Sequence, residues 1–224
     1  MTRDDDPCGD PLDDHLHHPG VCPKGRTGRL RGHNAVAATI RRHVERTGAF
    51  VDAERCIPEL YVQKENGSVE ERIMDLVVAW PASGVRFLLD VTIRSPFARE
   101  LARPHLQPGA AALNGERDKL SHYGEAVTPF ALEPFGRAGP RALQALAAMH
   151  RESCEFGRLR PGTGRASALS LRALRADLEA TVVQHAAQAS LQALGASTAQ
   201  ALGWAASPQR RAARPARARG GGAG

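Results

Sequence analysis

Two apolar segments in the middle of the 224-residue chain each contain one aspartate. Asp75 lies within residues 73–80 (IMDLVVAW). Asp90 lies within residues 85–93 (VRFLLDVTI), and only the turn-prone residues 81–84 (PASG) separate the two segments, so we predict neighbouring antiparallel strands of one hairpin. A carboxylate in a buried strand is costly unless a charge or a metal compensates it. The two aspartates therefore either repel each other or share a cation, and a shared cation would make a catalytic site.

A helix predicted over residues 109–126 adds a third candidate group. Lys119 and Tyr123 are four positions apart and lie on one face of this helix, where both side chains can project over a sheet edge that bears acids. Metal-dependent phosphodiester hydrolysis needs two carboxylates and a lysine. Asp75, Asp90 and a main-chain carbonyl would supply the hard oxygen ligands that Mg²⁺ prefers. The metal lowers the pKa of a bound water, and the lysine positions that water or stabilises the transition state.

The remaining pattern predicts a mixed α/β fold. A helix from residue 33 ends at a glycine, an extended segment covers 50–63, and an Asn-Gly turn at 66–67 leads into the first aspartate strand. A short strand over 128–132 follows the lysine helix, and a further helix begins with a proline at 140 and reaches about 156. This order of a helix, three strands, a helix, a strand and a helix fits a mixed sheet flanked by helices.

Composition limits the class of protein and the number of domains. The chain is 42% hydrophobic and carries a net charge of +6, with an acidic start and an arginine-rich end. No apolar run reaches the roughly 20 residues that a membrane-spanning helix needs, and no signal-peptide pattern is visible, so we expect an intracellular protein without membrane contact. The predicted regions are a Cys/His-rich leader (1–32), a core (33–157), an alanine-rich helical region (158–206) and a disordered basic tail (207–224).

The motifs, taken in order, resemble a known family. Segments 72–75 (RIMD), 89–93 (LDVTI), 119–123 (KLSHY) and 129–136 (PFALEPFG) look like the restriction-endonuclease-like domain with the PD-(D/E)XK signature. The version at the C-terminal end of non-LTR retrotransposon reverse transcriptase polyproteins is the most similar, over about residues 33–149. The resemblance implies an αβββαβ core, with the C-terminal helices added, and a Mg²⁺- or Mn²⁺-dependent DNA endonuclease derived from a retrotransposon, nuclear if the source is eukaryotic.

The resemblance assigns a role to individual residues. Asp75 matches the first metal-binding acid, and Asp90 matches the acid of the (D/E)XK element. Threonine occupies position 92, where the lysine of that element usually stands. Some branches of the superfamily carry the lysine on the following helix, which gives this role to Lys119. Glu59, on the preceding predicted strand, matches an additional acid found in many members.

A cluster of cysteines and histidines precedes the predicted core. Cys8, His18, Cys22 and His33 offer sulfur and imidazole ligands suited to tetrahedral Zn²⁺. His18 and Cys22 have a knuckle-like spacing, whereas the gap from Cys8 to His18 is longer than usual and the chain has no CxxC pair. Related retrotransposon proteins carry a Cys/His cluster at this place with one more cysteine. A zinc site and a flexible leader that binds no specific metal both remain open.

Basic clusters indicate a nucleic-acid partner. Five arginines precede or lie on the first predicted helix, and three more follow the core: Arg26, Arg29, Arg31, Arg41, Arg42, Arg158, Arg160 and Arg165. Such groups contact phosphates of DNA, or of RNA, without reading sequence. The helical region after Gly164 is either a helical hairpin on the core or a homodimer contact. Two other classes also remain: a catalytically inactive nucleic-acid-binding module, and a structural protein whose sheet acids only form ion pairs.

Overall fold

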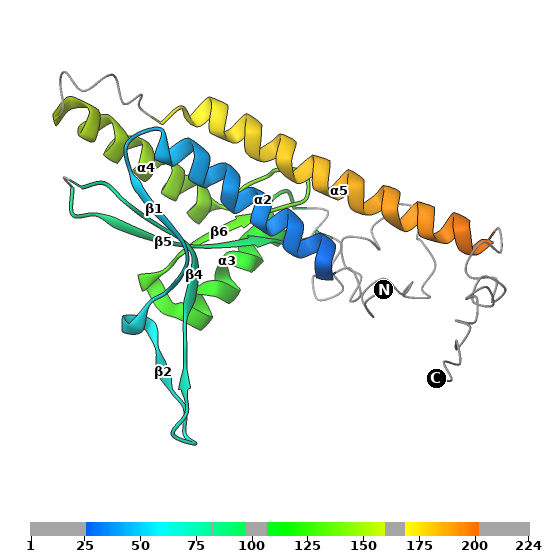
Figure 1. The fold of residues 1–224 in the computed structure, drawn as a ribbon, viewed down its shortest axis with the longest axis horizontal. Helices are drawn as coiled ribbons and strands as arrows, with labels where there is room; N and C mark the ends of the chain where they lie inside the picture. Colours follow the sequence, from blue (N-terminus) through cyan, green and yellow to red (C-terminus); the bar gives the residue numbers. More distant parts are fainter. Residues whose placement is uncertain (1–25, 82, 97–106, 160–168, 202–224) are drawn as a thin grey trace, which may run out of the picture.

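The computed structural model describes residues 26–81, 83–96, 107–159 and 169–201 (Figure 1). These residues form a mixed α/β structure. The elements in chain order are α2 (Arg26–Glu45), β1 (Phe50–Cys56), η3 (Pro58–Leu60), β2 (Val62–Gln63), β3 (Val69–Glu70), β4 (Ile73–Ala79), β5 (Arg86–Ile93), α3 (Ala110–Tyr123), η5 (Gly124–Ala126), β6 (Thr128–Leu132), α4 (Pro140–Leu159) and α5 (Leu171–Ala201). Four helices and a four-stranded mixed sheet therefore make up the described fold, as the sequence pattern predicted.

The sheet has the strand order β1-β4-β5-β6. β4 pairs antiparallel with both β1 and β5, whereas β6 lies parallel to β5. The predicted hairpin of the two aspartate strands is confirmed. The Asn66-Gly67 turn is also confirmed, since it joins the short antiparallel strands β2 and β3, with Gly67 at a φ of +80°. This two-stranded ribbon projects away from the sheet (Figure 1).

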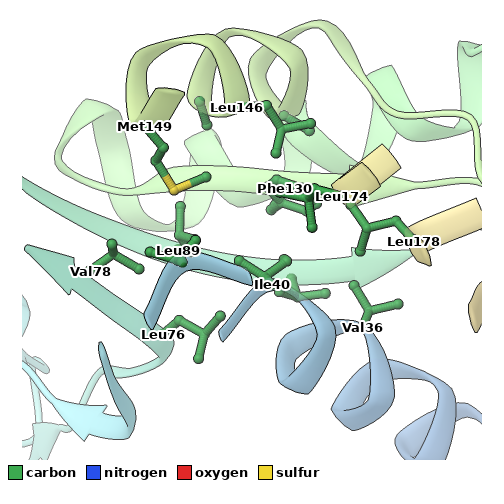
Figure 2. Packing of buried hydrophobic residues seen from close by; sticks show 14 of the residues in the cluster. Val36, Ile40, Leu76, Val78, Leu89, Phe130, Leu146, Met149, Leu174 and Leu178 are labelled. Atoms are coloured by element: carbon green, nitrogen blue, oxygen red, sulfur yellow. The ribbon is translucent and has the colours of Figure 1, made fainter. Parts of the chain in front are cut away.

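The main hydrophobic core lies between one face of the sheet and helices α2, α4 and α5, as Figure 2 shows. The fully or nearly fully buried residues in it include Val36, Ile40, Leu76, Val78, Leu89, Phe130, Leu146, Met149, Leu174 and Leu178. Apolar residues recur every second position along the strands and every third or fourth position along the helices, so each element buries one face. Residues of α5 therefore pack with the sheet in one core.

Helix α3 covers the opposite face of the sheet. A Cβ placed on Gly115 would lie 3.2 Å from the Thr92 methyl group and 3.5 Å from the Ala131 Cβ. These two residues alternate along their strands with Val91 and Phe130, which belong to the main core. The side chains of Asp90 and Thr92, two positions apart on β5, therefore face α3.

Two helix predictions need correction or completion. The first helix begins at Arg26 rather than at residue 33, because a helix already anchored by a buried face extends at little cost even where the sequence lacks apolar periodicity. Residues 169–201, the described part of the region after residue 164, contain one continuous helix, α5, which lies along α2 (Figure 1). The Thr39 and Thr181 hydroxyls are 3.2 Å apart across this contact, and His43 Nε2 lies 2.7 Å from the Asp177 carboxylate. Among the described residues no helix is long and apolar enough to cross a membrane.

The central position of Leu89 gives a stability prediction. Its side chain is completely buried between β4 and β6, so Leu89→Ala is expected to lower the free energy of unfolding by about 3 kcal/mol through lost burial and the cavity left behind. Leu191→Ala on α5, where the leucine is 67% exposed, should change it by less than about 0.5 kcal/mol. Urea unfolding followed by circular dichroism measures both values, and equal midpoints would contradict the assigned core.

Candidate metal centre

The two predicted acids meet where strands β4 and β5 stop pairing. Leu76 and Leu89 form the last regular pair between the two strands, and Asp75 and Asp90 are their neighbours just beyond it. Beyond this point the Val91 N–H donates a 2.6 Å hydrogen bond to Asp75 Oδ2, so a side-chain carboxylate replaces a backbone acceptor. The two aspartates therefore lie at the same end of adjacent strands, with Asp75 hydrogen-bonded to β5 and α2 and Asp90 paired with α3.

Asp75 is held by two donors on one oxygen. His33 Nε2, from helix α2, lies 3.0 Å from Asp75 Oδ2, the oxygen that also accepts the Val91 N–H. Within the described residues these contacts leave Asp75 Oδ1 without a protein partner. The hydrogen bond to Asp75 raises the pKa of His33 to about 9, more than burial of the ring lowers it.

Asp90 is buried and paired with the predicted lysine. Its residue is 4% exposed, and Lys119 Nζ lies 2.8 Å from Oδ1. Burial raises the pKa of Asp90, while the hydrogen bond and positive charge of Lys119 oppose that rise. Asp90 Oδ2 is buried and has no hydrogen-bond partner among the described residues. A carboxylate oxygen without a partner is costly to bury, and a bound metal ion would supply the missing partner.

Close packing of α3 brings Lys119 to this position. The helix approaches β5 closely because Gly115 has no side chain; a Cβ there would lie 2.8 Å from Arg94 Cγ and 3.2 Å from the Thr92 methyl group. Lys119 is one helical turn further along the same face. A longer side chain at position 92 would occupy the space that α3 uses, so the threonine and the helix-borne lysine are structurally compatible with each other.

Tyr123, the last residue of α3, lies beside Lys119. Burial and the negative charge of Asp90 raise the pKa of Tyr123 to about 12, so its hydroxyl remains protonated. The Tyr123 ring contacts two cations, with the Arg72 guanidinium carbon 5.1 Å and Lys119 Nζ 5.7 Å from the ring centre. Tyr123 thus restricts Lys119 to the neighbourhood of Asp90.

Arg72 and Arg94, arginines close in sequence to the two aspartates, pair with other acids. Arg72 lies 3.2 Å from Glu70, and Arg94 lies 2.6 Å from Asp118. The partner of Asp75 is His33, which the sequence had placed in the zinc set. No spacing rule connects two residues 42 positions apart, and only the packing of α2 against the sheet brings them together.

The other predicted ligands lie away from this centre or outside the described residues. Glu59 is in η3, is exposed, and has its carboxylate 3.9 Å from Arg86; its described contacts include neither aspartate. Cys8, His18 and Cys22 lie outside the described residues. Across the described ranges no group of three or more His, Cys, Asp or Glu side chains is arranged to hold a metal ion. A site here therefore rests on two carboxylates, completed by a main-chain carbonyl, water or substrate oxygens, as is common for Mg²⁺.

Comparison with known proteins assigns no family to the chain. No protein-family model matches it, and no curated protein matches it at a significant level.

Proposed function

We propose that this chain is a Mg²⁺- or Mn²⁺-dependent DNA endonuclease that hydrolyses phosphodiester bonds. The observation that carries the proposal is a buried Asp90 that pairs with Lys119 at 2.8 Å and has Oδ2 without a described partner, next to Asp75 at the same end of the neighbouring strand. Lys119 and His33 each pair with one oxygen of these acids, which leaves Asp90 Oδ2 and Asp75 Oδ1 as the oxygens that a cation would bind. Two adjacent carboxylates are favourable when a divalent cation is bound between them.

The donor set fits such an ion. Asp75 Oδ1 and Asp90 Oδ2 are the oxygens without described protein partners, and hard carboxylate oxygens are the ligands that Mg²⁺ and Mn²⁺ prefer. When bound, the cation would acidify water and offset the charge that develops on the phosphate. Lys119 Nζ, already held at this point by Asp90 and Tyr123, would orient the attacking water and stabilise the transition state. The water oxygen forms a bond to phosphorus, and the bond from phosphorus to one sugar oxygen breaks.

The fold supports the resemblance on which the narrower proposal rests. The main elements follow the order helix, three sheet strands, helix, strand, which is the αβββαβ order that the restriction-endonuclease-like resemblance implies. The resemblance further places this domain with those of non-LTR retrotransposon reverse transcriptases, so we propose a retrotransposon origin.

Arginines on α2 offer contacts to the nucleic-acid backbone. Arg41 and Arg42 are exposed and pair with Glu45 and Asp177 respectively. Exposed ion pairs of this kind contribute little to stability, so phosphate groups can replace the carboxylates at little cost. These contacts would bind DNA without selecting a sequence.

The position of Thr92 favours a second candidate, an inactive DNA-binding domain derived from such a nuclease. In this case Lys119 would only neutralise Asp90, and the chain would bind DNA without cutting it. Catalytic activity is the property that separates the two candidates, since both predict DNA binding.

Plasmid nicking by the purified chain tests the proposal. Supercoiled DNA should be converted to nicked or linear forms with Mg²⁺ or Mn²⁺ and not with EDTA, and Asp75→Asn should abolish the conversion. Glu59→Gln provides a matched acidic control, because Glu59 contacts Arg86 instead of the two aspartates; its rate should stay within about threefold of the unmodified chain. DNA binding without metal-dependent nicking would favour the inactive candidate.

A further inference from the structure

The imidazole ring of His33 is fixed at both nitrogens. Nδ1 lies 3.0 Å from Asn34 Oδ1, and Nε2 lies 3.0 Å from Asp75 Oδ2. A carboxylate oxygen only accepts hydrogen bonds, so His33 Nε2–H donates to Asp75. This hydrogen bond occupies Nε2 and Asn34 lies against Nδ1, which favours a role through Asp75 over a ligand role.

The contacts of Asp75 show what that role would be. His33 Nε2 and the Val91 N–H approach the same oxygen, Oδ2, at 3.0 Å and 2.6 Å. Two donors on one oxygen restrict the orientation of the carboxylate, because turning it away from this position breaks both hydrogen bonds at once. Val91 directly follows Asp90, so the donor on β5 is tied in sequence to the second acid.

We propose that His33 is a positioning residue that, together with the Val91 N–H, holds Asp75 Oδ2 and thereby presents Asp75 Oδ1 to the divalent cation shared with Asp90. The inference rests on the proposed function, since it assumes the metal site of that function. Groups that hydrogen-bond to a metal ligand orient it, and their removal typically lowers metal affinity about 10- to 100-fold. The His33 side chain is only 26% exposed, so the ring has little freedom to leave its position beside Asp75.

Direct measurement of Mn²⁺ binding to the full chain tests this role. Electron paramagnetic resonance of free Mn²⁺ gives the Kd without requiring DNA cleavage. His33→Ala should raise the Kd about 10- to 100-fold. His33→Gln, whose amide N–H can replace the Nε2 donor, should recover most of that loss. His122→Ala, at an exposed histidine paired with Glu70, should leave the Kd unchanged.

Cleavage kinetics distinguish positioning from a general structural role. For His33→Ala the Mg²⁺ concentration at half-maximal rate should rise by the same factor as the Mn²⁺ Kd, while the rate at saturating Mg²⁺ stays within a few-fold. Thermal melts in EDTA establish that each variant is folded. A folded His33→Ala chain that binds Mn²⁺ as tightly as the unmodified chain overturns the proposal, and so does a folded His33→Gln chain as weak as His33→Ala.

Failure of the endonuclease proposal can be distinguished from failure of the positioning role of His33. An unmodified chain that binds Mn²⁺ but does not cut DNA contradicts the endonuclease proposal, and the comparison of His33 variants would still support or overturn the positioning role. An unmodified chain that binds no Mn²⁺ contradicts both proposals at once.

Discussion

Replacement of Asp90 by asparagine is expected to lower Mg²⁺-dependent DNA cleavage about a thousandfold, which corresponds to about 4 kcal/mol of lost transition-state stabilisation. The amide keeps the shape of the side chain but removes the negative charge from the position that Lys119 contacts at 2.8 Å. It also replaces one carboxylate oxygen of the proposed cation site with a group that binds divalent cations poorly. Initial rates of plasmid nicking at saturating Mg²⁺ measure the effect.

Two controls separate this loss from unfolding. Asp118→Asn removes an exposed carboxylate on α3 that pairs with Arg94, and its cleavage rate should stay within about threefold of the unmodified chain. Circular dichroism of Asp90→Asn should show the unmodified helix content, since the asparagine is isosteric and burial already disfavours the charged form of Asp90. Full cleavage by a folded Asp90→Asn chain would be inconsistent with a metal-binding role for this acid.

The second large effect is expected at Lys119. Lys119→Met keeps most of the side-chain volume against the Tyr123 ring but removes the ammonium group, and it should lower the rate at saturating Mg²⁺ about a hundredfold. It also leaves Asp90 buried without its cation, so the pKa of Asp90 should rise further and the free energy of unfolding should fall by about 1–3 kcal/mol at neutral pH. Single-turnover cleavage and urea unfolding measure the two effects.

The control for Lys119 is another paired lysine. Lys64 in the β2–β3 ribbon contacts Glu70 and is about half exposed, so Lys64→Met should change neither the cleavage rate nor the stability by much. Equal nicking by the unmodified chain, Lys119→Met and Lys64→Met would indicate a contaminating nuclease. Loss of stability in Lys119→Met without loss of cleavage would assign the lysine to charge neutralisation alone.

The sequence predicted the acidic pair because its positions depend on local rules. The short turn at 81–84 determines that β4 and β5 are neighbours, and strand alternation determines that Asp90 faces α3. Helical spacing placed Lys119 and Tyr123 on one face, and both lie beside Asp90. The short turn, the two-residue repeat of a strand and the 3.6-residue repeat of a helix were sufficient to predict these relative positions.

The same spacing rule failed for Glu116. Glu116 lies three positions before Lys119, so helical spacing alone predicts that it shares the face of Lys119, but Glu116 is 1% exposed and accepts a 3.0 Å hydrogen bond from the Ala142 N–H in the first turn of α4. Residues three apart on a helix differ by about 60° in direction, which is enough for one side chain to face the sheet and the other to face a neighbouring helix. The packing of α4 decides between these directions, and local spacing does not encode it.

His33 and α5 show the larger limit of prediction from one sequence. The contact between His33 and Asp75 spans 42 positions and depends on how α2 lies across the sheet. The alanine-rich pattern of α5 predicted a helix, but it did not determine whether the helix packs on the core or against a second chain. Buried Leu174 and Leu178 show that α5 packs on the main core (Figure 2).

The most direct test of the metal centre is a crystal structure of the full chain with Mn²⁺, read from the anomalous scattering of the ion. We expect one Mn²⁺ between the strand ends, with an oxygen of Asp75 and an oxygen of Asp90 both at about 2.1–2.2 Å, close to the Mg²⁺ distance. His33 should remain hydrogen-bonded to the other oxygen of Asp75. No ion at this position at saturating Mn²⁺, with Asp75 and Asp90 paired only to His33 and Lys119, would contradict the proposed centre.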